Sequence, residues 1–228
     1  MFLREWNDLP NFMKCKEVKP YYEGLRRRRL QLILKRLFDL LMAIVMITFF
    51  SIPMIIVAII IKMDSQGPIF FRQERVTLYG EIFKIHKFRT MVNGAEKLGS
   101  GVTVKVDPRV TKVGRVLRKY RIDEIPQLID IILGKMSFVG TRPEIPKYVK
   151  KYSKEMYATL LMPAGITSEA SIRFKDESEL LNGAEDIDKL YEVHILPEKM
   201  KWNLKQIKNY SLLGDGLTLL RTVVAILR

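Results

Sequence analysis

Two adjacent carboxylates, Asp123 and Glu124, stand at the end of a strongly basic part of the chain. Pro126 predicts that a helix starts at this pair, and the free amides of a helix N-terminus favour carboxylate and phosphate groups. Adjacent carboxylates are most often surface residues or helix caps. Here the pair could instead neutralise a phosphate with the help of Mg²⁺, or the aspartate could act as a nucleophile. Arginines surround the pair at positions 115, 118, 121 and 142.

Other metal and thiol chemistries find little support in the composition. The 228 residues include one cysteine, Cys15, and two distant histidines, His86 and His194. One cysteine excludes a disulfide scaffold and a cysteine-based zinc site, and the histidine spacing forms no ligand motif. Any metal would therefore be a hard cation that carboxylates and phosphate oxygens bind.

The chain is both basic and apolar. It has 39 Lys+Arg against 25 Asp+Glu, a formal charge of +14, yet 48% of it is hydrophobic. This excludes a disordered basic tail, and it also excludes a protein with many membrane spans. The excess charge lies in residues 1–36 and residues 82–122. A nucleic-acid footprint explains such blocks in general, but the first block directly precedes a long apolar run, as a cytoplasmic membrane flank does.

That apolar run covers residues 40–61, which are 22 residues without a charge. As a straight helix it would measure roughly 33 Å, enough to cross a membrane. Ser51 and Pro53 lie near its middle and predict a kink. A straight span would export everything after it, including Asp123 and Glu124. We therefore prefer a re-entrant hairpin that enters and leaves on the cytoplasmic face, over an ordinary spanning helix.

The elements around the carboxylate pair follow from local patterns. Residues 69–76 and 81–88 predict a β-hairpin, and residues 110–120 a short amphipathic helix. The helix that starts at Pro126 should end at Gly134. Further helices are expected at residues 147–161, 177–191, 198–210 and 217–227, and a loop at residues 93–109.

A series of motifs in consistent order then resembles the bacterial sugar transferase family, the small monotopic phosphoglycosyl transferases. The resemblance covers residues 35–210. Its motifs are Lys35-Arg36-Leu37-Phe38-Asp39, the run from Gly67 to Arg75, Lys87-Phe88-Arg89-Thr90-Met91, the run from Asp107 to Arg115, Ile122-Asp123-Glu124-Ile125-Pro126-Gln127-Leu128 and the run from Gly134 to Pro143.

The resemblance implies a reaction. A UDP-sugar transfers its sugar-1-phosphate to undecaprenyl phosphate, UMP is released, and the route is a covalent ping-pong with Mg²⁺. Asp123 would be the nucleophile and Glu124 a Mg²⁺ ligand. Arg118 and Arg142 would bind phosphates, and Lys87 and Gln127 are further candidates.

Three departures from the family pattern stand out. The Ser-Pro pair of the membrane helix is here Ser51-Ile52-Pro53, and a Gly-Pro-Arg-Pro loop is Gly140-Thr141-Arg142-Pro143. The third is the family's Arg-Pro-Gly-x-Thr-Gly, which is here Pro163-Ala164-Gly165-Ile166-Thr167-Ser168 and lacks the arginine. We take Arg173 as its substitute, with a structural role as the alternative, and place the family's Asp-x-x-Tyr at Asp188 and Tyr191.

These observations predict an α+β, mostly helical monotopic protein of the bacterial cytoplasmic (inner) membrane, with its active site on the cytoplasmic face. Expected partners are a UDP-sugar, undecaprenyl phosphate, membrane phospholipids and downstream glycosyltransferases of a surface glycan, but no nucleic acid. A membrane-tethered basic scaffold or nucleic-acid binder is the alternative. The expected parts are a basic N-terminal extension (1–34), a re-entrant membrane helix (35–62), a catalytic domain (63–210) and a C-terminal membrane-surface helix (211–228).

Overall fold

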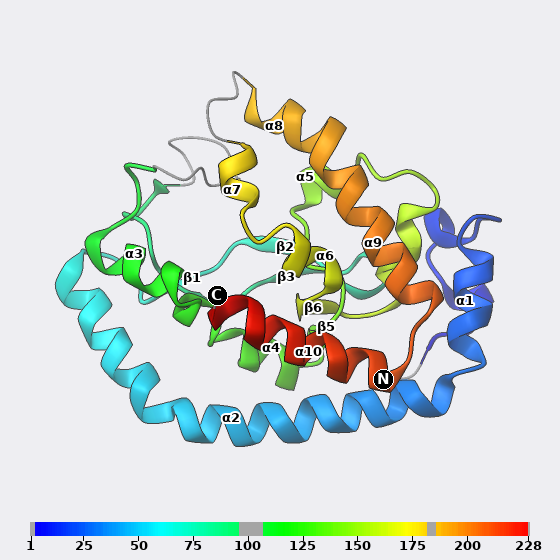
Figure 1. Cartoon of the computed structure of the whole chain (residues 1–228), viewed down its shortest axis with the longest axis horizontal. Helices are drawn as coiled ribbons and strands as arrows, with labels where there is room; N and C mark the ends of the chain where they lie inside the picture. The colour runs from blue at the N-terminus through cyan, green and yellow to red at the C-terminus, as the bar shows by residue number, and fades with distance from the viewer. Residues whose placement is uncertain (1–2, 96–106, 182–185, 228) are drawn as a thin grey trace.

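The computed structural model describes residues 3–95, 107–181 and 186–227, and within them the chain is mostly helical with small sheets, as expected (Figure 1). Parts of two predicted segments, the loop at 93–109 and the helix at 177–191, lie outside these residues. The α-helices are α1 (Lys19–Arg26), α2 (Arg29–Asp64), α3 (Lys112–Lys119), α4 (Gln127–Ile132), α5 (Pro146–Val149), α6 (Glu169–Arg173), α7 (Glu177–Leu180), α8 (Ile187–Leu190), α9 (Leu196–Lys208) and α10 (Leu212–Leu227). The shorter turns are 3₁₀ helices at Trp6–Asp8, Asn11–Met13, Leu78–Gly80, Ile122–Glu124 and Met156–Leu161, and a π-helix at Tyr191–Ile195.

The predicted hairpin is present as two short antiparallel ladders. Strand β1 (Phe70–Phe71) pairs with β4 (Lys87–Phe88), and β2 (Glu74–Val76) pairs with β3 (Ile82–Lys84). A separate parallel pair joins β5 (Met136–Val139) to β6 (Ala164–Thr167). The backbone of β6 approaches the residue that follows β5 very closely, because a Cβ added at Gly165 would lie 2.1 Å from the amide nitrogen of Gly140. Position 165 therefore requires glycine, and the close approach lies just before the Arg142 loop.

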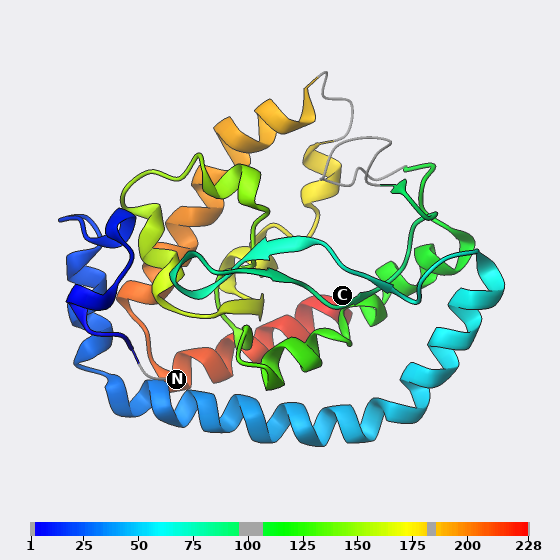
Figure 2. The same ribbon diagram turned by 180° about the vertical axis from the view of Figure 1, so that it is seen from behind.

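The apolar run is one continuous α-helix, so Ser51 and Pro53, where a kink was predicted, do not interrupt it. Helix α2 continues through Pro53 for 36 residues and curves along one side of the molecule (Figures 1 and 2). Ser51 Oγ donates to the carbonyl of Thr48 at 2.7 Å, and Thr48 Oγ1 donates to that of Ile44 at 2.9 Å. Such side-chain bonds bend a helix and compete for its carbonyls, while proline removes a donor. The result is a bend rather than a break.

Both ends of α2 are tied to the same folded body. Near its start, Lys35 forms a buried ion pair with Asp215 of α10, and Arg36 donates to the carbonyls of Ile131 and Ile132 at the end of α4. At its other end, Arg89 donates to the carbonyl of Ser65 at 2.6 Å. These contacts satisfy carbonyls that helix ends leave free.

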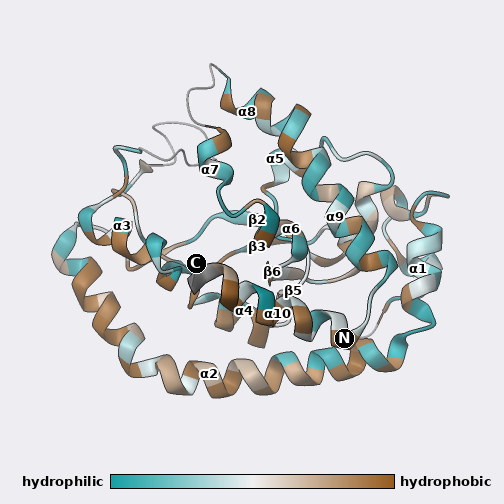
Figure 3. Ribbon diagram, in the orientation of Figure 1, coloured by the Kyte–Doolittle hydropathy of each residue, from teal (hydrophilic) through white to brown (hydrophobic). Residues whose placement is uncertain are grey.

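A broad apolar face of α2 and α10 remains exposed (Figure 3). Within the described residues, α2 alone is long and apolar enough to cross a membrane, and 6% of its most apolar stretch is buried. The long helix therefore marks a membrane protein. The exposed apolar residues of α10 are Leu213, Leu217, Leu220, Val223 and Val224.

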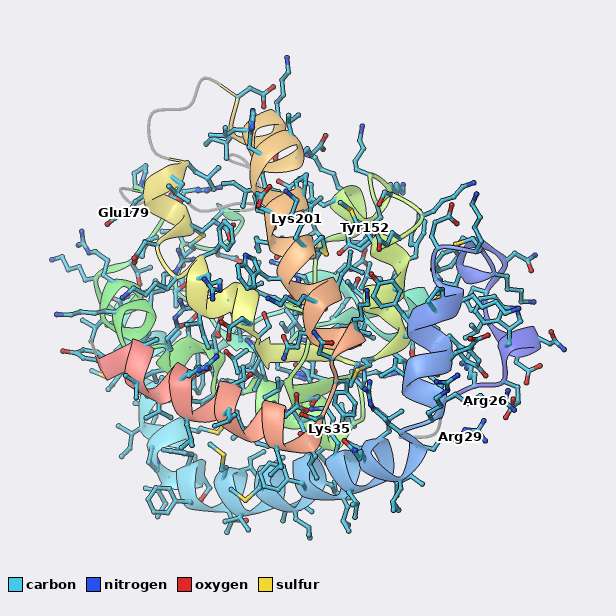
Figure 4. The ribbon with its side chains drawn as sticks, turned by 45° about the vertical axis from the view of Figure 1, so that its right-hand side comes forward. Arg26, Arg29, Lys35, Tyr152, Glu179 and Lys201 are labelled. Atoms are coloured by element: carbon cyan, nitrogen blue, oxygen red, sulfur yellow. The ribbon has the colours of Figure 1, made fainter. Side chains whose placement is uncertain are left out.

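The N-terminal segment is packed against the rest of the fold. Tyr22 donates to the carbonyl of Arg4, and the Arg4 guanidinium lies 4.5 Å from the ring of Tyr79. Arg26 and Arg29 point outward from α1 and the start of α2 (Figure 4). This segment therefore combines a buried face with a basic outer face. Its buried residues in the main hydrophobic cluster include Leu9, Met13, Val18, Tyr22 and Leu25.

Two predicted helices are interrupted. The helix expected at residues 147–161 consists of α5 and a separate 3₁₀ helix, and the hydroxyl of Ser153 accepts from the amide of Met156 at the start of the second. The helix expected at residues 177–191 ends at Leu180, and α8 begins anew after Asp186, whose side chain accepts from the Lys189 amide. In both cases a short polar side chain starts a new helix, a competition that periodicity does not register.

Candidate active site

The carboxylate pair lies in a strained turn between α3 and α4. Arg121 adopts a left-handed backbone conformation with φ 56°, and the 3₁₀ helix Ile122–Glu124 follows it directly. A non-glycine residue in this region costs roughly 1 kcal/mol or more, so the surrounding packing must hold the turn. Asp123 and Glu124 are 9% and 8% exposed. The pair is therefore buried, which excludes the alternative that these carboxylates are ordinary surface residues.

Helix α3 is held closely against the chain that follows β4. A Cβ at Gly114 would lie 2.0 Å from the carbonyl oxygen of Thr90, and the amide of Thr111 donates to that same oxygen. Arg118 Nε donates to Thr90 Oγ1 at 2.8 Å. This docking places the Arg118 guanidinium near Asp123.

Glu124 is fixed by two cations on one oxygen atom. Lys87 Nζ lies 2.8 Å and Arg142 Nη2 lies 2.6 Å from Glu124 Oε1. Burial alone would raise the pKa of Glu124, but Arg142 and Lys87 outweigh burial and hold its pKa well below the usual value. Glu124 is therefore an ionised anchor for both cations.

Asp123 behaves in the opposite way. Within the described part of the chain, no hydrogen bond or ion pair reaches its carboxylate. Burial raises the pKa of Asp123, and the charge of Glu124 adds to this, although Lys87 and Arg118 oppose it. A buried carboxylate with uncommitted oxygens beside cations can attack an electrophilic phosphorus atom.

Gln127 lies in the turn of helix that follows the pair. It is 1% exposed, and its Nε2 atom has no hydrogen-bond partner in the described residues. A buried donor without a partner is uncommon in a folded protein and is explained where a ligand completes it.

Arg142 comes from the loop that follows β5. Contact with Glu124 raises its pKa further. Arg75 on β2 supports this loop, because its Nη1 donates to the carbonyl of Pro143 at 3.0 Å. The sequence analysis gave no role to Arg75. Period-two alternation along the strand, which places it on the same side as Gln73, could have found it, and Arg75 Nη2 does donate to Gln73 Oε1.

Arg173 is not brought to this cluster. Its guanidinium lies 3.6 Å from the ring centroid of Trp202, and its Nε donates to Glu169 at 3.2 Å. It is thus part of the α6–α9 contact. The cations that the structure does collect around Asp123 and Glu124 are Lys87, Arg75, Arg118, Arg121 and Arg142.

Asp130 and His86 align the strand that carries Lys87. Asp130 is 1% exposed, and it accepts the backbone amide of His86 at 2.8 Å. The ring Nδ1 of His86 lies 2.7 Å from the other Asp130 oxygen. Because Asp130 is on α4 and Lys87 follows His86, this contact connects the two elements that meet at Glu124.

The carboxylate oxygens of the pair are also candidate ligands for magnesium. No group of three or more His, Cys, Asp or Glu side chains within the described residues forms a protein-only metal site. All contacts that hold Glu124 converge on Oε1. Within the described residues, Glu124 Oε2 and both Asp123 oxygens therefore have no hydrogen-bond or ion-pair partner. Mg²⁺ binds one or two carboxylates and completes its shell with water and substrate phosphates. The donor set fits that mode.

The site thus combines a buried carboxylate pair, a group of cations around it and an exposed apolar helix in the same fold. The chain belongs to the bacterial sugar transferase family, whose sequence model matches residues 30–228. This match confirms the resemblance seen in the motifs.

Several named proteins are similar to this chain. One is the UDP-N-acetylgalactosamine-undecaprenyl-phosphate N-acetylgalactosaminephosphotransferase of Aeromonas hydrophila, 37% identical over 85% of this chain and 44% of its own length. A second is the UDP-glucose:undecaprenyl-phosphate glucose-1-phosphate transferase of Caulobacter vibrioides, 33% identical over 85% of this chain and 69% of its own. The chain thus spans less than half of the Aeromonas protein.

Proposed function

We propose that this protein transfers a sugar-1-phosphate from a UDP-sugar to undecaprenyl phosphate through a covalent Asp123 intermediate. One observation carries the proposal: Asp123 is buried and uncommitted, while Glu124 beside it is fixed by Lys87 and Arg142. The first residue is available to react, and the second holds the cations in place.

The charge of the site suits a pyrophosphate. Five cations, Lys87, Arg75, Arg118, Arg121 and Arg142, surround the two carboxylates, so positive charge is in excess there. Uncompensated buried charge is unfavourable unless an opposite charge completes it. The phosphates of a nucleotide sugar supply that charge, and Gln127 Nε2 offers a further donor.

The reaction has two balanced steps. The Asp123 carboxylate oxygen attacks the phosphorus that bears the sugar, an aspartyl–phosphate bond forms, and the bond to UMP breaks. A phosphate oxygen of undecaprenyl phosphate then attacks the same phosphorus. This forms undecaprenyl-diphosphate-sugar and frees the Asp123 carboxylate. In both steps Arg118 and Arg142 bind the phosphate oxygens, and no added proton is required.

Glu124 through Oε2, together with Asp123, would hold Mg²⁺. When bound, that ion neutralises charge on the substrate phosphates. The residues of the chain do the rest: Lys87 and Arg142 keep Glu124 oriented, and burial keeps water away from the intermediate.

The acceptor lipid places the reaction at the bacterial cytoplasmic membrane, on its cytoplasmic face. We propose that α2 enters and leaves on that face. The support is that Lys35 and Ser65, near opposite ends of α2, both contact the one folded body. A helix crossing a core of about 30 Å would separate these contacts. Membrane phospholipids would cover the exposed face of α2 and α10, and Arg26 and Arg29 would meet their headgroups.

The product would start a surface glycan, which downstream glycosyltransferases extend. The names of the relatives mention N-acetylgalactosamine and glucose, so UDP-sugars of these two types head the list of donors to test. The scaffold or nucleic-acid alternative loses support because Lys87 and Arg89 of the second basic block are turned inward.

The decisive experiment incubates the full chain in lipid nanodiscs with undecaprenyl phosphate, Mg²⁺ and a panel of UDP-sugars. Released UMP is the readout, and mass spectrometry locates the covalent adduct formed without acceptor. We expect UMP release with one class of sugar and an adduct on Asp123. An adduct on another residue would refute the nucleophile assignment, and DNA binding without UMP release would favour the scaffold.

A further inference from the structure

A second charged network lies behind the Arg142 loop, and the reaction above does not use it. Lys199 of α9 is 5% exposed, and its Nζ lies 2.9 Å from Glu177 Oε2, 2.9 Å from the Tyr191 hydroxyl and 3.6 Å from Glu144 Oε1. Tyr191 donates to that same Glu144 oxygen at 2.7 Å. A lysine with two carboxylates and a tyrosine in the interior is costly to assemble, so its position needs a reason.

The residues of this network come from elements that are distant from one another in the chain. Tyr191 is the first residue of the π-helix Tyr191–Ile195, an irregularity common near functional sites. Glu177 comes from α7, and Glu144 follows the Arg142 loop by two residues. The carbonyl of Glu144 also accepts from the amide of Val76, next to Arg75. The network therefore adjoins both Arg142 in the loop and Arg75 on β2.

The two carboxylates act on those arginines. Glu177 is one of the charges that raise the pKa of Arg142, after Glu124 itself. Glu144 opposes the effect of burial on Arg75. Since Lys199 lies between Glu144 and Glu177, it offsets both charges. Without it, Glu177 would act on Arg142 and Glu144 on Arg75 with no buried ammonium to offset them.

We infer that Lys199 is a positioning residue that keeps Arg142 available to the substrate phosphates by neutralising Glu177 and Glu144. The inference rests on the proposed function, because it concerns how that site binds its donor. It predicts opposite effects from the two ends of one ion pair. Removing Lys199 leaves Glu177 to compete for Arg142 and Glu144 to compete for Arg75, whereas removing Glu177 takes a competitor for Arg142 away.

The test compares KM and kcat for the UDP-sugar that the unaltered protein accepts. We expect Lys199→Met to raise KM about 10-fold with a smaller change in kcat, and Glu177→Gln to leave KM unchanged or lower it. The double variant Lys199→Met/Glu177→Gln should recover most of the loss. Lys201→Met is the matched control, because Lys201 lies on the same helix, is exposed and pairs with Glu198 (Figure 4).

A purely structural ion pair predicts another pattern, in which both single variants raise KM and the double variant restores nothing. That result, or an unchanged KM in folded Lys199→Met, would overturn the inference. If Lys199→Met does not fold, Glu177→Gln still decides, since a raised KM contradicts the inference. A wild-type protein that releases no UMP from any donor would instead refute the proposed function.

Discussion

Asp123 and Glu124 are adjacent in the chain and equally buried, yet their surroundings shift their pKa values in opposite directions. Lys87 and Arg142 both bind Glu124, and neither binds Asp123. The two carboxylates therefore have different roles, which the following predictions test.

Substitution of the pair should separate activity from stability. Asp123→Asn is expected to reduce UMP release at least about 10³-fold and to abolish the adduct. Because burial raises the pKa of Asp123, its charged form opposes folding at neutral pH. The variant should therefore have a higher Tm at pH 7, and the gain should shrink as pH falls and Asp123 takes up its proton. A lower Tm at pH 7 would contradict this assignment.

Glu124→Gln should show the reverse. The pKa of Glu124 is lowered in the fold, so its charge stabilises the protein above about pH 4.5, and this stability is lost as pH falls through the folded-state pKa. We expect a lower Tm at pH 7 and a difference from wild type that narrows in acid. Thermal unfolding of both variants from about pH 2 to pH 8 measures this.

The rate should depend on pH with two limbs. On the acid side, activity should fall as Asp123 is protonated, and this fall should begin at a pH above 3.8, the ordinary pKa of an aspartate. On the alkaline side, burial lowers the pKa of Lys87 from its ordinary 10.5, despite Glu124. Activity should therefore fall there when Lys87 loses its proton. Lys87→Arg should move the alkaline limb upward in a profile of kcat/KM, and an unmoved limb would exclude Lys87 as its source.

The close contact of α3 should be sensitive to a single methyl group. Gly114→Ala places a Cβ 2.0 Å from the Thr90 carbonyl, so α3 must shift and carry Arg118 with it. We expect Tm to fall by about 5 °C and activity roughly 10-fold. Gly216→Ala is the control, because a Cβ there meets nothing within 4 Å. Equal behaviour of the two variants would show that α3 does not position Arg118.

The ion pair between α2 and α10 should matter for assembly of the membrane face. Lys35 and Asp215 have side chains that are 5% and 10% exposed. Lys35→Met leaves a buried carboxylate and should cost about 3 kcal/mol, or roughly 8 °C in Tm. The double variant Lys35→Met/Asp215→Leu should recover stability. Failure of the double variant to recover would mean that the pair is not the main contact.

The topology of α2 can be measured by labelling. In a Cys15→Ser background, Asn11→Cys and Lys201→Cys place single exposed thiols in the N-terminal segment and on α9. A membrane-impermeant maleimide should label both in inverted vesicles and neither in intact cells. Labelling of the two positions from opposite sides would establish a spanning helix.

Sequence patterns were sufficient where a property is local. The order of motifs identified the family, charge counting located the basic blocks, and Pro126 and Gly134 marked the helix after the carboxylate pair. A run of 22 uncharged residues revealed the membrane helix because hydrophobicity is a property of each residue alone. The interruptions at Ser153 and Asp186 were missed, since a cap depends on one hydrogen bond rather than on a period.

Only the tertiary structure could decide which cation meets which carboxylate. Lys87, Arg142 and Glu124 come from three elements, and Arg173 lies elsewhere against Trp202. The roles of Asp123 and Glu124 depend on burial and on charges a few ångströms away, and both arise only when distant segments pack. The sequence by itself thus determined the family and located the carboxylate pair, while three-dimensional packing decided which carboxylate is held by cations and which is free.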